Sequence, residues 1–310
     1  MRFYSAEEVH SALSLPALAD AIVEAFRAGS SAPLRHAHAI SATDTLLLMP
    51  AWNAGPAGVI GVKLVTVLPN NRARGLSTVN ALYVLFDRES GEPRAVIDGE
   101  ALTLRRTAAA SLLAARYLAR IDARNVLIVG TGRLARFMAQ AHCAGRDVER
   151  LLIWGRNPEH AQALASTLRT EGLPAEAAAD LQSAVGASHI VSCATTAASP
   201  VVHGAWLAAG THLDLVGAFR RDMREADDAA VARSQVYVDT YAGALTEAAD
   251  VIEPIERGVI AREDVRGELA ELVTGSVAGR KRADDITLFK SVGTAIEDLA
   301  AASLLVALTG

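Results

Sequence analysis

The sequence predicts an α/β protein of two domains, the second of which carries a parallel β-sheet. The chain has 310 residues, which is more than one domain usually contains. After residue 124, short apolar segments alternate with segments of helical periodicity, as in a parallel sheet covered by helices. Before residue 100, β-like segments follow one another directly, which indicates a second α+β domain with an antiparallel or mixed sheet.

The N-terminal region is predicted to begin with a helix and to continue with strands. Ser5, followed by Glu8 three residues later, is typical of a helix start, and apolar residues then recur at helical spacing up to Gly29. Strands are expected over residues 45–49, 59–67 and 79–86, with a turn at 90–93. An Ala- and Leu-rich helix over 102–121 then leads into the second domain.

In the second domain, strands and helices are expected in turn, at residues 125–129, 134–143, 151–154, 158–169, 189–194, 211–216 and 236–238. The apolar segment 286–308 is predicted to be a final helix that returns to the first domain. We therefore expect the first domain to contain residues 1–118 and 290–310, and the second to contain 119–289.

Composition and charge exclude several classes of protein. The net charge is −5 with both signs interspersed, so no basic stripe is available for nucleic acid. No uncharged apolar segment approaches the ~18 residues of a membrane span, and the first ten residues lack the apolar core of a signal peptide. Two distant cysteines and eight scattered histidines, with no third ligand near His36 and His38, predict neither a disulfide framework nor a metal site. We expect a cytoplasmic protein.

The most informative local motif is Gly130-Thr131-Gly132-Arg133-Leu134-Ala135, which lies between a predicted strand and a predicted helix. Gly130 permits a tight turn, Gly132 lets the backbone approach a pyrophosphate, and Ala135 lets the helix pack closely on the strand. The N–H groups at the start of the helix are then available to phosphates. The motif predicts a Rossmann domain that binds a nicotinamide dinucleotide through these six residues.

The ends of the following strands bear on the choice of cofactor. An enzyme that uses NAD usually has an acidic residue after the second strand, where this chain has Arg156 and Asn157. A guanidinium there can pair with a 2′-phosphate, which favours NADP(H) over NAD(H); the alternative is a surface arginine in an NAD enzyme. Thr195, Val216 and Gly217 follow later strands and are expected to border the ribose and nicotinamide.

Several further motifs occur in a fixed order along the chain. They are Gly61-Val62-Lys63-Leu64-Val65, Asp98-Gly99, Leu102-Thr103-Leu104-Arg105-Arg106-Thr107, Val216-Gly217-Ala218-Phe219, Asp222-Met223-Arg224-Glu225 and Ser291-Val292-Gly293-Thr294-Ala295-Ile296-Glu297-Asp298. With the glycine loop, they resemble the ornithine cyclodeaminase/mu-crystallin family over nearly the whole chain. The resemblance implies a homodimer with an NAD(P)-binding Rossmann domain, to which Ser291 and Gly293 contribute. It also implies a substrate and dimerisation domain built from the N-terminal part and the C-terminal helix.

The resemblance further implies a site for a small amino acid or imino acid. Lys63 and Arg106 match the family's ligands for the substrate carboxylate, and Arg35 matches a further arginine. Fixed cationic donors orient a carboxylate, and a guanidinium can hold both of its oxygens. We assign catalysis to Lys63 and Arg106; the alternative for each cation is a structural salt bridge. Lys63 also interrupts an apolar strand, and a lysine is rarely buried there without a partner or a task.

Phe219 departs from the cyclodeaminase pattern, although it is expected to line the substrate pocket. The resemblance places a catalytic aspartate at this position, and a phenylalanine cannot transfer a proton. Asp222 could replace it, but a turn-capping role is favoured for that residue. The preferred hypothesis is therefore an NAD(P)-dependent reductase of an imine next to a carboxylate, or a dehydrogenase of the matching amino acid. The alternatives are ornithine cyclodeaminase and a non-catalytic protein that binds NADP(H) and a small ligand.

Overall fold

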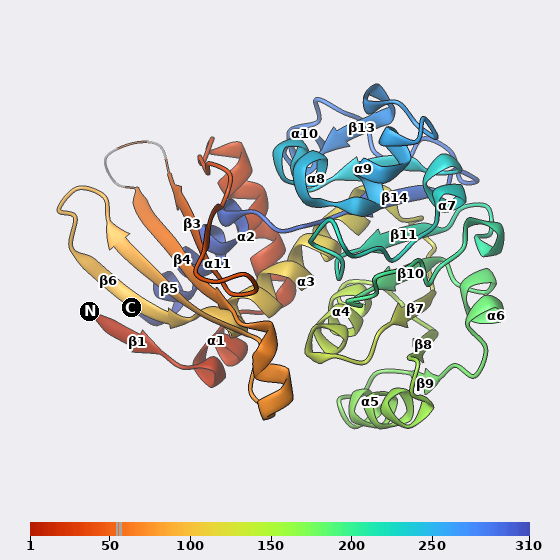
Figure 1. The fold of residues 1–310 in the computed structure, drawn as a ribbon, viewed down its shortest axis with the longest axis horizontal. Coiled ribbons are helices and arrows are strands. Elements are labelled where there is room, and N and C mark those ends of the chain that lie inside the picture. The colour runs from red at the N-terminus through yellow and green to blue at the C-terminus, as the bar shows by residue number, and fades with distance from the viewer. Residues whose placement is uncertain (54, 56–57) are drawn as a thin grey trace. The chain divides into compact units, whose positions relative to one another are not determined.

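The computed structural model describes residues 1–53, 55 and 58–310, and these form two compact units (Figure 1). The first unit consists of residues 1–107 with 294–310, and the second of residues 108–293. Each unit has its own β-sheet, which confirms the predicted α/β class. The C-terminal helix belongs to the first unit, although the whole second unit separates it from the N-terminal part in sequence.

The first unit contains a six-stranded sheet of order β1-β6-β5-β4-β3-β2. Strand β1 runs parallel to β6 and the other neighbours are antiparallel, so the sheet is mixed, as predicted. Its elements are β1 (Arg2–Tyr4), α1 (Ala6–Ala12), α2 (Leu15–Arg27), β2 (His36–Ala39), β3 (Thr45–Trp52), β4 (Val59–Val67), the 3-10 helix η1 (Pro69–Arg74), β5 (Val79–Asp87), β6 (Pro93–Asp98), the first part of α3 (Gly99–Leu118), and α11 (Ala295–Thr309). The predicted capping box is present, because Ser5 and Glu8 bond reciprocally at the start of α1.

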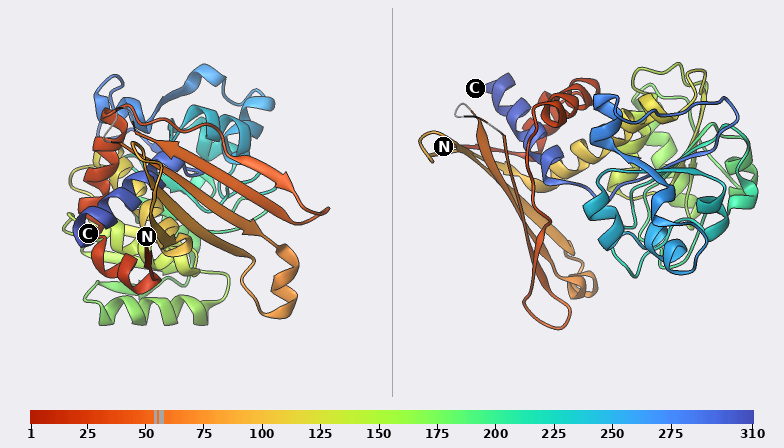
Figure 2. Two further views of the ribbon diagram at one scale, coloured as in Figure 1. Left: turned by 90° about the vertical axis from the view of Figure 1, so that its left-hand side faces the viewer. Right: turned by 90° about the horizontal axis from the view of Figure 1, so that it is seen from above.

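One face of this sheet carries helices α2 and α11, as Figure 2 shows. Helix α11 packs on the central strands β3, β4 and β5. Along β4, Gly61, Lys63 and Val65 are buried on this face, whereas Leu64, between them in sequence, is 37% exposed. Leu82 on the neighbouring β5 is likewise 45% exposed. The opposite face of the sheet is therefore apolar and accessible.

The second unit contains an eight-stranded sheet of order β13-β12-β14-β11-β10-β7-β8-β9, in which every pair is parallel. Its strands are β7 (Asn125–Val129), β8 (Arg150–Trp154), β9 (Ala175–Ala177), β10 (Ile190–Cys193), β11 (His212–Leu215), β12 (Gln235–Val238), β13 (Val265–Glu268) and β14 (Thr287–Lys290). Buried aliphatic side chains of these strands form the core. This order contains the doubly wound Rossmann arrangement, with β7 and β10 at the point where the winding reverses.

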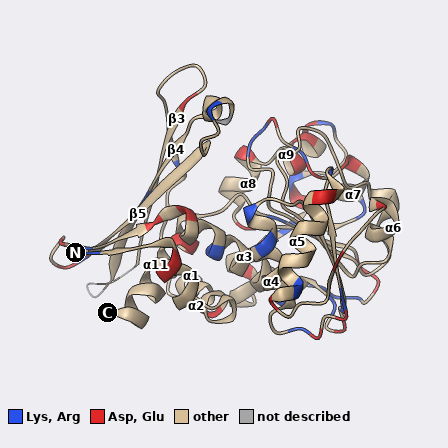
Figure 3. Cartoon of the chain, turned by 90° about the horizontal axis from the view of Figure 1, so that it is seen from below, with Lys and Arg blue, Asp and Glu red and all other residues tan. Residues whose placement is uncertain are grey.

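The remaining elements of the second unit connect these strands. They are the rest of α3, α4 (Arg133–Cys143), α5 (Pro158–Thr170), α6 (Leu181–Gly186), η2 (Gly204–Trp206), α7 (Asp228–Ala232), α8 (Tyr241–Glu247), α9 (Ala249–Glu256), η3 (Arg262–Asp264) and α10 (Leu269–Thr274). Lysine and arginine alternate with acidic residues over this unit, as Figure 3 shows. Both cysteines are free, and Cys193 is fully buried in the sheet.

The expectation of one helix over 286–308 is wrong in its first part. Residues Thr287–Lys290 form strand β14, which pairs with β11 on one side and β12 on the other. The helix starts only at Ala295, after Gly293 with a φ of 84°. A short, fully buried apolar segment lacks the periodicity that distinguishes a strand from a helix. The sequence of β14 was therefore compatible with either structure. Strands β1, β6, β9 and β13 were not predicted, because they are short or, in the case of β6, begin at a proline.

A membrane-spanning helix must be long and strongly apolar. No single helix among the described residues has the necessary length and hydropathy. Helices α1 and α2 have sufficient length and hydropathy only when they are taken together, and the pair is bent by 86°.

Candidate functional site

The glycine-rich loop lies directly after β7 in the second unit. Gly130 has a φ of 132°, and a Cβ atom there would lie 2.6 Å from the carbonyl oxygen of Ala194. Gly132 is the N-cap of α4 and offers no capping side chain. Among the described residues other than its chain neighbours, no atom lies within 4 Å of where its Cβ would be. Ala135, in the first turn of α4, is fully buried. The loop thus leaves open space before the first N–H groups of α4, which fits a pyrophosphate.

Other residues expected to bind the cofactor follow the carboxyl ends of strands in the same parallel sheet. Thr195 follows β10, Val216 and Gly217 follow β11, and Ser291 follows β14. Because all these strands are parallel, their carboxyl ends meet at one edge, where open α/β sheets bind their ligands. The sheet therefore brings these residues to the same edge as the glycine loop.

Arg156 and Asn157 follow β8, the neighbour of β7. Arg156 is exposed, as a residue that meets a ribose phosphate would be. The side chain of Asn157 caps α5, because its Oδ1 accepts a hydrogen bond from the backbone N–H of Glu159 at 2.9 Å. Asn157 therefore fixes the start of α5 beside Arg156.

Asp239 is a buried carboxylate to which the sequence analysis gave no role. Its Oδ2 accepts hydrogen bonds from the hydroxyl of Ser291 at 3.0 Å, from the backbone N–H of Val292 at 2.7 Å and from that of Gly293 at 2.6 Å. It thereby fixes the loop after β14 that contains two of the predicted cofactor residues. The one signal in the sequence was that Asp239 precedes Thr240, the residue that caps helix α8.

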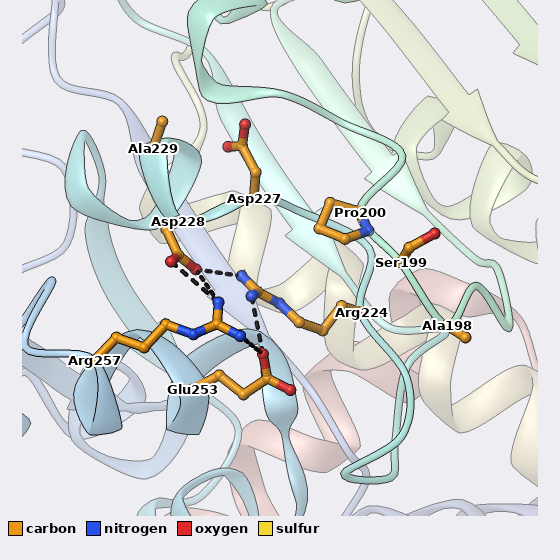
Figure 4. Close-up of a pocket in the computed structure, with 9 residues that line it drawn as sticks. All are labelled: Ala198, Ser199, Pro200, Arg224, Asp227, Asp228, Ala229, Glu253 and Arg257. Atoms are coloured by element: carbon orange, nitrogen blue, oxygen red, sulfur yellow. Dashed lines mark hydrogen bonds and ion pairs between the residues drawn. The ribbon is translucent and has the colours of Figure 1, made fainter.

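A cavity of about 480 Å³ lies beside the loop that follows β10, and Figure 4 shows its lining. Arg224 and Arg257 both lie between the carboxylates of Asp228 and Glu253, and the four groups form a ring of ion pairs. Because the arginines are held by acidic partners, the cavity has little capacity for a substrate carboxylate. The ring instead anchors the segment around Arg224 to helix α9.

The predicted substrate residues lie in the first unit. Lys63 on β4 is only 2% exposed, and its Nζ lies 2.9 Å from Oδ1 and 2.7 Å from Oδ2 of Asp298. The same ammonium group donates a hydrogen bond to Oγ1 of Thr103 at 3.3 Å. The Thr103 hydroxyl donates its own hydrogen bond to the carbonyl oxygen of Gly99 at 2.7 Å, so its lone pairs are available to Lys63. Lys63 is thus a buried cation held in one orientation.

Arg106 on α3 shares the same carboxylate. Its Nε lies 3.0 Å from Oδ1 of Asp298, and its Nη1 lies 2.8 Å from Oε2 of Glu297. Both acidic residues are fully buried in the first turn of α11. The N-terminus of a helix stabilises negative charge, so this turn is a favourable place for two adjacent carboxylates. The structure therefore brings Lys63 and Arg106 together at Asp298, which lies 235 positions from Lys63 and 192 positions from Arg106 in the sequence.

The pKa values of this cluster are coupled. Burial lowers the pKa of Lys63 to about 8, Arg106 and Arg35 act in the same direction, and Asp298 opposes them. Burial alone would raise the pKa of Asp298, but the charges of Lys63, Arg106 and Arg35 hold it below its usual value. Arg35, which lies just before β2, is therefore near enough to act on both groups. Within this set of five residues, which includes Glu297, three cations face two carboxylates.

Tyr83 adds a hydroxyl group beside this cluster. It lies opposite Lys63 in the pairing of β4 with β5 and is fully buried. Its hydroxyl has no hydrogen-bond partner among the described residues, and burial together with the charge of Asp298 raises its pKa. A Cβ on Gly61 would lie 1.8 Å from that hydroxyl, so the ring requires glycine at this position.

Comparison with known proteins identifies the family of this chain. The model of the ornithine cyclodeaminase/mu-crystallin family matches residues 1–307. The chain belongs to this family. The Δ1-pyrroline-2-carboxylate reductase of Paracoccus denitrificans is 42% identical over 287 residues, which are 91% of this chain and 90% of the relative. The sequence resemblance is thus confirmed.

Two solved structures of the family are also similar. That of Thermococcus litoralis Δ1-pyrroline-2-carboxylate reductase with NADH and L-proline has a TM-score of 0.94 and 35% identity, covering 99% of this chain and 97% of that one. An archaeal alanine dehydrogenase dimer with bound NAD has a TM-score of 0.91 and 30% identity, covering 99% and 95%. This family member is accordingly an oxidoreductase whose Rossmann domain binds a nicotinamide dinucleotide.

The buried cluster of the first unit also contains residues whose contacts the sequence did not reveal. Glu297 and Asp298 occurred in a recognised motif, but their pairing with Lys63 and Arg106 was not predicted. The available signal was two adjacent acids in the otherwise apolar helix α11. Phe219 is partly buried against the apolar core of the second unit, and Asp222 is exposed and paired with Arg220. Among the described residues, no group of three or more His, Cys, Asp or Glu side chains could hold a metal ion.

Proposed function

We propose that the protein reduces the C=N bond of Δ1-pyrroline-2-carboxylate to give L-proline, with NAD(P)H as the hydride donor. The observation that carries this proposal is the buried cluster in which Lys63 and Arg106 share Asp298. The identity of 42% to a reductase of this substrate supports it. Hydride transfer to a carbon next to a carboxylate needs both an anion clamp and a proton donor, and the cluster offers both.

The clamp is formed by the cations of the cluster. Lys63 and Arg106 both lie against Asp298 in the interior, and the charge of Arg35 also acts on Lys63 and Asp298. Ammonium and guanidinium groups in fixed positions can hold and orient a substrate carboxylate.

The proton comes from Lys63 in this proposal. The cofactor, once bound at the glycine loop, would provide the hydride for the imine carbon, and the ammonium of Lys63 gives a proton to the imine nitrogen. A pKa of about 8 lies close to neutral pH, where a general acid is both protonated and ready to release its proton. Asp298 and Thr103 hold the Nζ atom in place for this transfer.

The test is the consumption of NADH and NADPH by the purified protein with Δ1-pyrroline-2-carboxylate and its six-membered homologue, piperideine-2-carboxylate. Rapid consumption with the five-membered imine and formation of L-proline are the expected results. L-ornithine with NAD serves as the control for cyclodeamination. Ammonia release from ornithine, without reduction of either imine, would contradict the proposal and revive the cyclodeaminase hypothesis. Cofactor binding without turnover on any of these substrates would indicate a binding protein.

The preference for NADP(H) belongs to the same proposal and depends on Arg156. Its exposed guanidinium at the end of β8 is available to a 2′-phosphate. Arg156→Ala is expected to raise KM for NADPH by about 10-fold, because a charge-assisted contact contributes ~1.5–3 kcal/mol, and to leave KM for NADH nearly unchanged. Arg150→Ala, at the other end of β8, is the control. Equal changes for both cofactors would argue against a role for Arg156 in selecting the phosphate.

We also propose that the protein is a homodimer, like the related alanine dehydrogenase dimer. The exposed apolar face of the six-stranded sheet, with Leu64 and Leu82, supplies a surface for a second copy. Exposed apolar patches of this kind mark sites of protein contact. Sedimentation equilibrium should give twice the 32.5 kDa mass of one chain, and a monomer would refute the proposal.

The two free cysteines agree with a reducing, cytoplasmic location.

A further inference from the structure

Glu225 is a fully buried carboxylate that connects two strand ends in the second unit. Its Oε1 accepts hydrogen bonds from the backbone N–H of Thr195 at 2.7 Å and from the Thr195 hydroxyl at 3.0 Å. Its Oε2 accepts from the backbone N–H groups of Gly217 at 2.8 Å and Ala218 at 3.1 Å. Thr195 follows β10 and Gly217 follows β11, so one side chain fixes the loops after both strands.

Glu225 is itself held from behind. Asp250 accepts hydrogen bonds from the backbone N–H groups of Glu225 at 2.8 Å and Ala226 at 3.1 Å. The ammonium of Lys290, at the end of β14, lies 2.9 Å from Asp250 and 3.8 Å from Glu225. The neighbouring Arg224 belongs to the ion-pair ring of Figure 4. Backbone bonds and charges on both sides therefore leave the Glu225 carboxylate little freedom.

The two loops are also in close contact with each other. A Cβ on Gly217 would lie 2.1 Å from both the backbone nitrogen and the carbonyl oxygen of Thr195, and 2.5 Å from Oε1 of Glu225. Only glycine allows this approach, so the loops cannot separate without losing their shared acceptor. Burying a carboxylate is costly unless hydrogen bonds satisfy it, and here four bonds from two loops do so.

The position of these loops indicates which part of a dinucleotide they meet. In a doubly wound sheet, the half that starts with β7 holds the adenosine side, and the half that starts with β10 holds the nicotinamide side. We propose that Glu225 is a positioning residue for the nicotinamide half of the cofactor, acting through the backbone at Thr195 and at Gly217–Ala218. The proposal rests on cofactor binding at this sheet edge and not on the identity of the substrate.

The test compares two ligands in the Glu225→Gln variant. Glutamine keeps the shape, but its Nε2 cannot accept hydrogen bonds, so one loop loses its acceptor. The Kd for NADH is expected to rise by about 10-fold or more, since hydrogen bonds to a charged group are stronger than those between neutral groups. The Kd for ADP-ribose, which lacks the nicotinamide, is expected to change less than about 2-fold. Titration calorimetry without substrate measures both constants, so this result is independent of the imine proposal.

Two further variants complete the test. Glu253→Gln breaks the ion-pair ring on the same segment but leaves both loops bonded, and it should bind NADH and ADP-ribose like the wild type. Thr195→Val removes the hydroxyl bond to Glu225 and a longer bond of 3.4 Å from the backbone N–H of Ala197, and it should weaken NADH binding by about 3-fold, while sparing ADP-ribose. This variant decides the question if Glu225→Gln does not fold. Unchanged NADH affinity, or an equal loss for both ligands, would overturn the proposal.

Discussion

Replacing Lys63 with methionine is expected to lower kcat/KM for Δ1-pyrroline-2-carboxylate by about 10³-fold, because general acid catalysis typically contributes ~10²–10⁴-fold. Methionine has a similar length but neither a charge nor a proton to give. The loss should appear mainly in kcat, since Arg106 and Arg35 remain to bind the carboxylate. The initial rate of NAD(P)H consumption measures the effect.

The chain offers a matched control for this substitution. Lys281 is exposed in the loop before β14, so Lys281→Met makes the same chemical change without touching the cluster. It is expected to leave kcat and KM within about 2-fold of the wild type, as surface substitutions usually do. A Lys63→Met enzyme with the activity of the Lys281→Met enzyme would remove Lys63 from the mechanism.

The pH dependence gives a second view of the same residue. Lys63 must be protonated to donate a proton, and burial lowers its pKa to about 8. The kcat of the wild type should therefore be steady below this pH and fall as pH rises through about 8. The residual activity of Lys63→Met should lack this fall, because the titrating group is gone. A fall at the same pH in both enzymes would assign the titration to another group.

Much of the Rossmann unit could be predicted because its signals are local. The strands Val59–Val67 in the first unit and Asn125–Val129 in the second agree with the structure residue for residue, since each is a mainly apolar segment bounded by turn residues. Gly130 and Gly132 were recognisable because the phosphate loop depends on backbone conformation at consecutive positions. In such cases the sequence contains the whole structural feature within a few residues.

The partners of Lys63 and Arg106 could not be predicted in this way. Asp298 meets Lys63 across 235 residues of chain, and only the folding of α11 onto the sheet brings them together. The same is true of Glu225, whose bonds to Thr195 connect loops 30 residues apart. Strand β14 was mistaken for helix because its burial on both sides depends on neighbours from distant parts of the chain.

Replacing Asp298 with asparagine is expected to lower the free energy of unfolding by about 3–5 kcal/mol, because removing one partner leaves other buried charges uncompensated. Asparagine preserves the shape of the side chain, so the loss isolates its charge. Lys63 and Arg106 would then lose the carboxylate that they share, and their burial keeps water from compensating the two charges. Urea unfolding followed by circular dichroism measures the change.

The direction in which pH changes the free energy of unfolding shows whether the charge of Asp298 or its packing stabilises the fold. The pKa of Asp298 is lower in the folded protein than in the unfolded chain, so its charge stabilises the fold at neutral pH. This contribution is lost as pH falls through the folded pKa, and the difference between wild type and Asp298→Asn should shrink in acid. Asp222→Asn, on an exposed pair with Arg220, should cost less than about 0.5 kcal/mol. Equal destabilisation by both substitutions would mean that the buried cluster holds no structural charge, and that Lys63 reaches its orientation by packing alone.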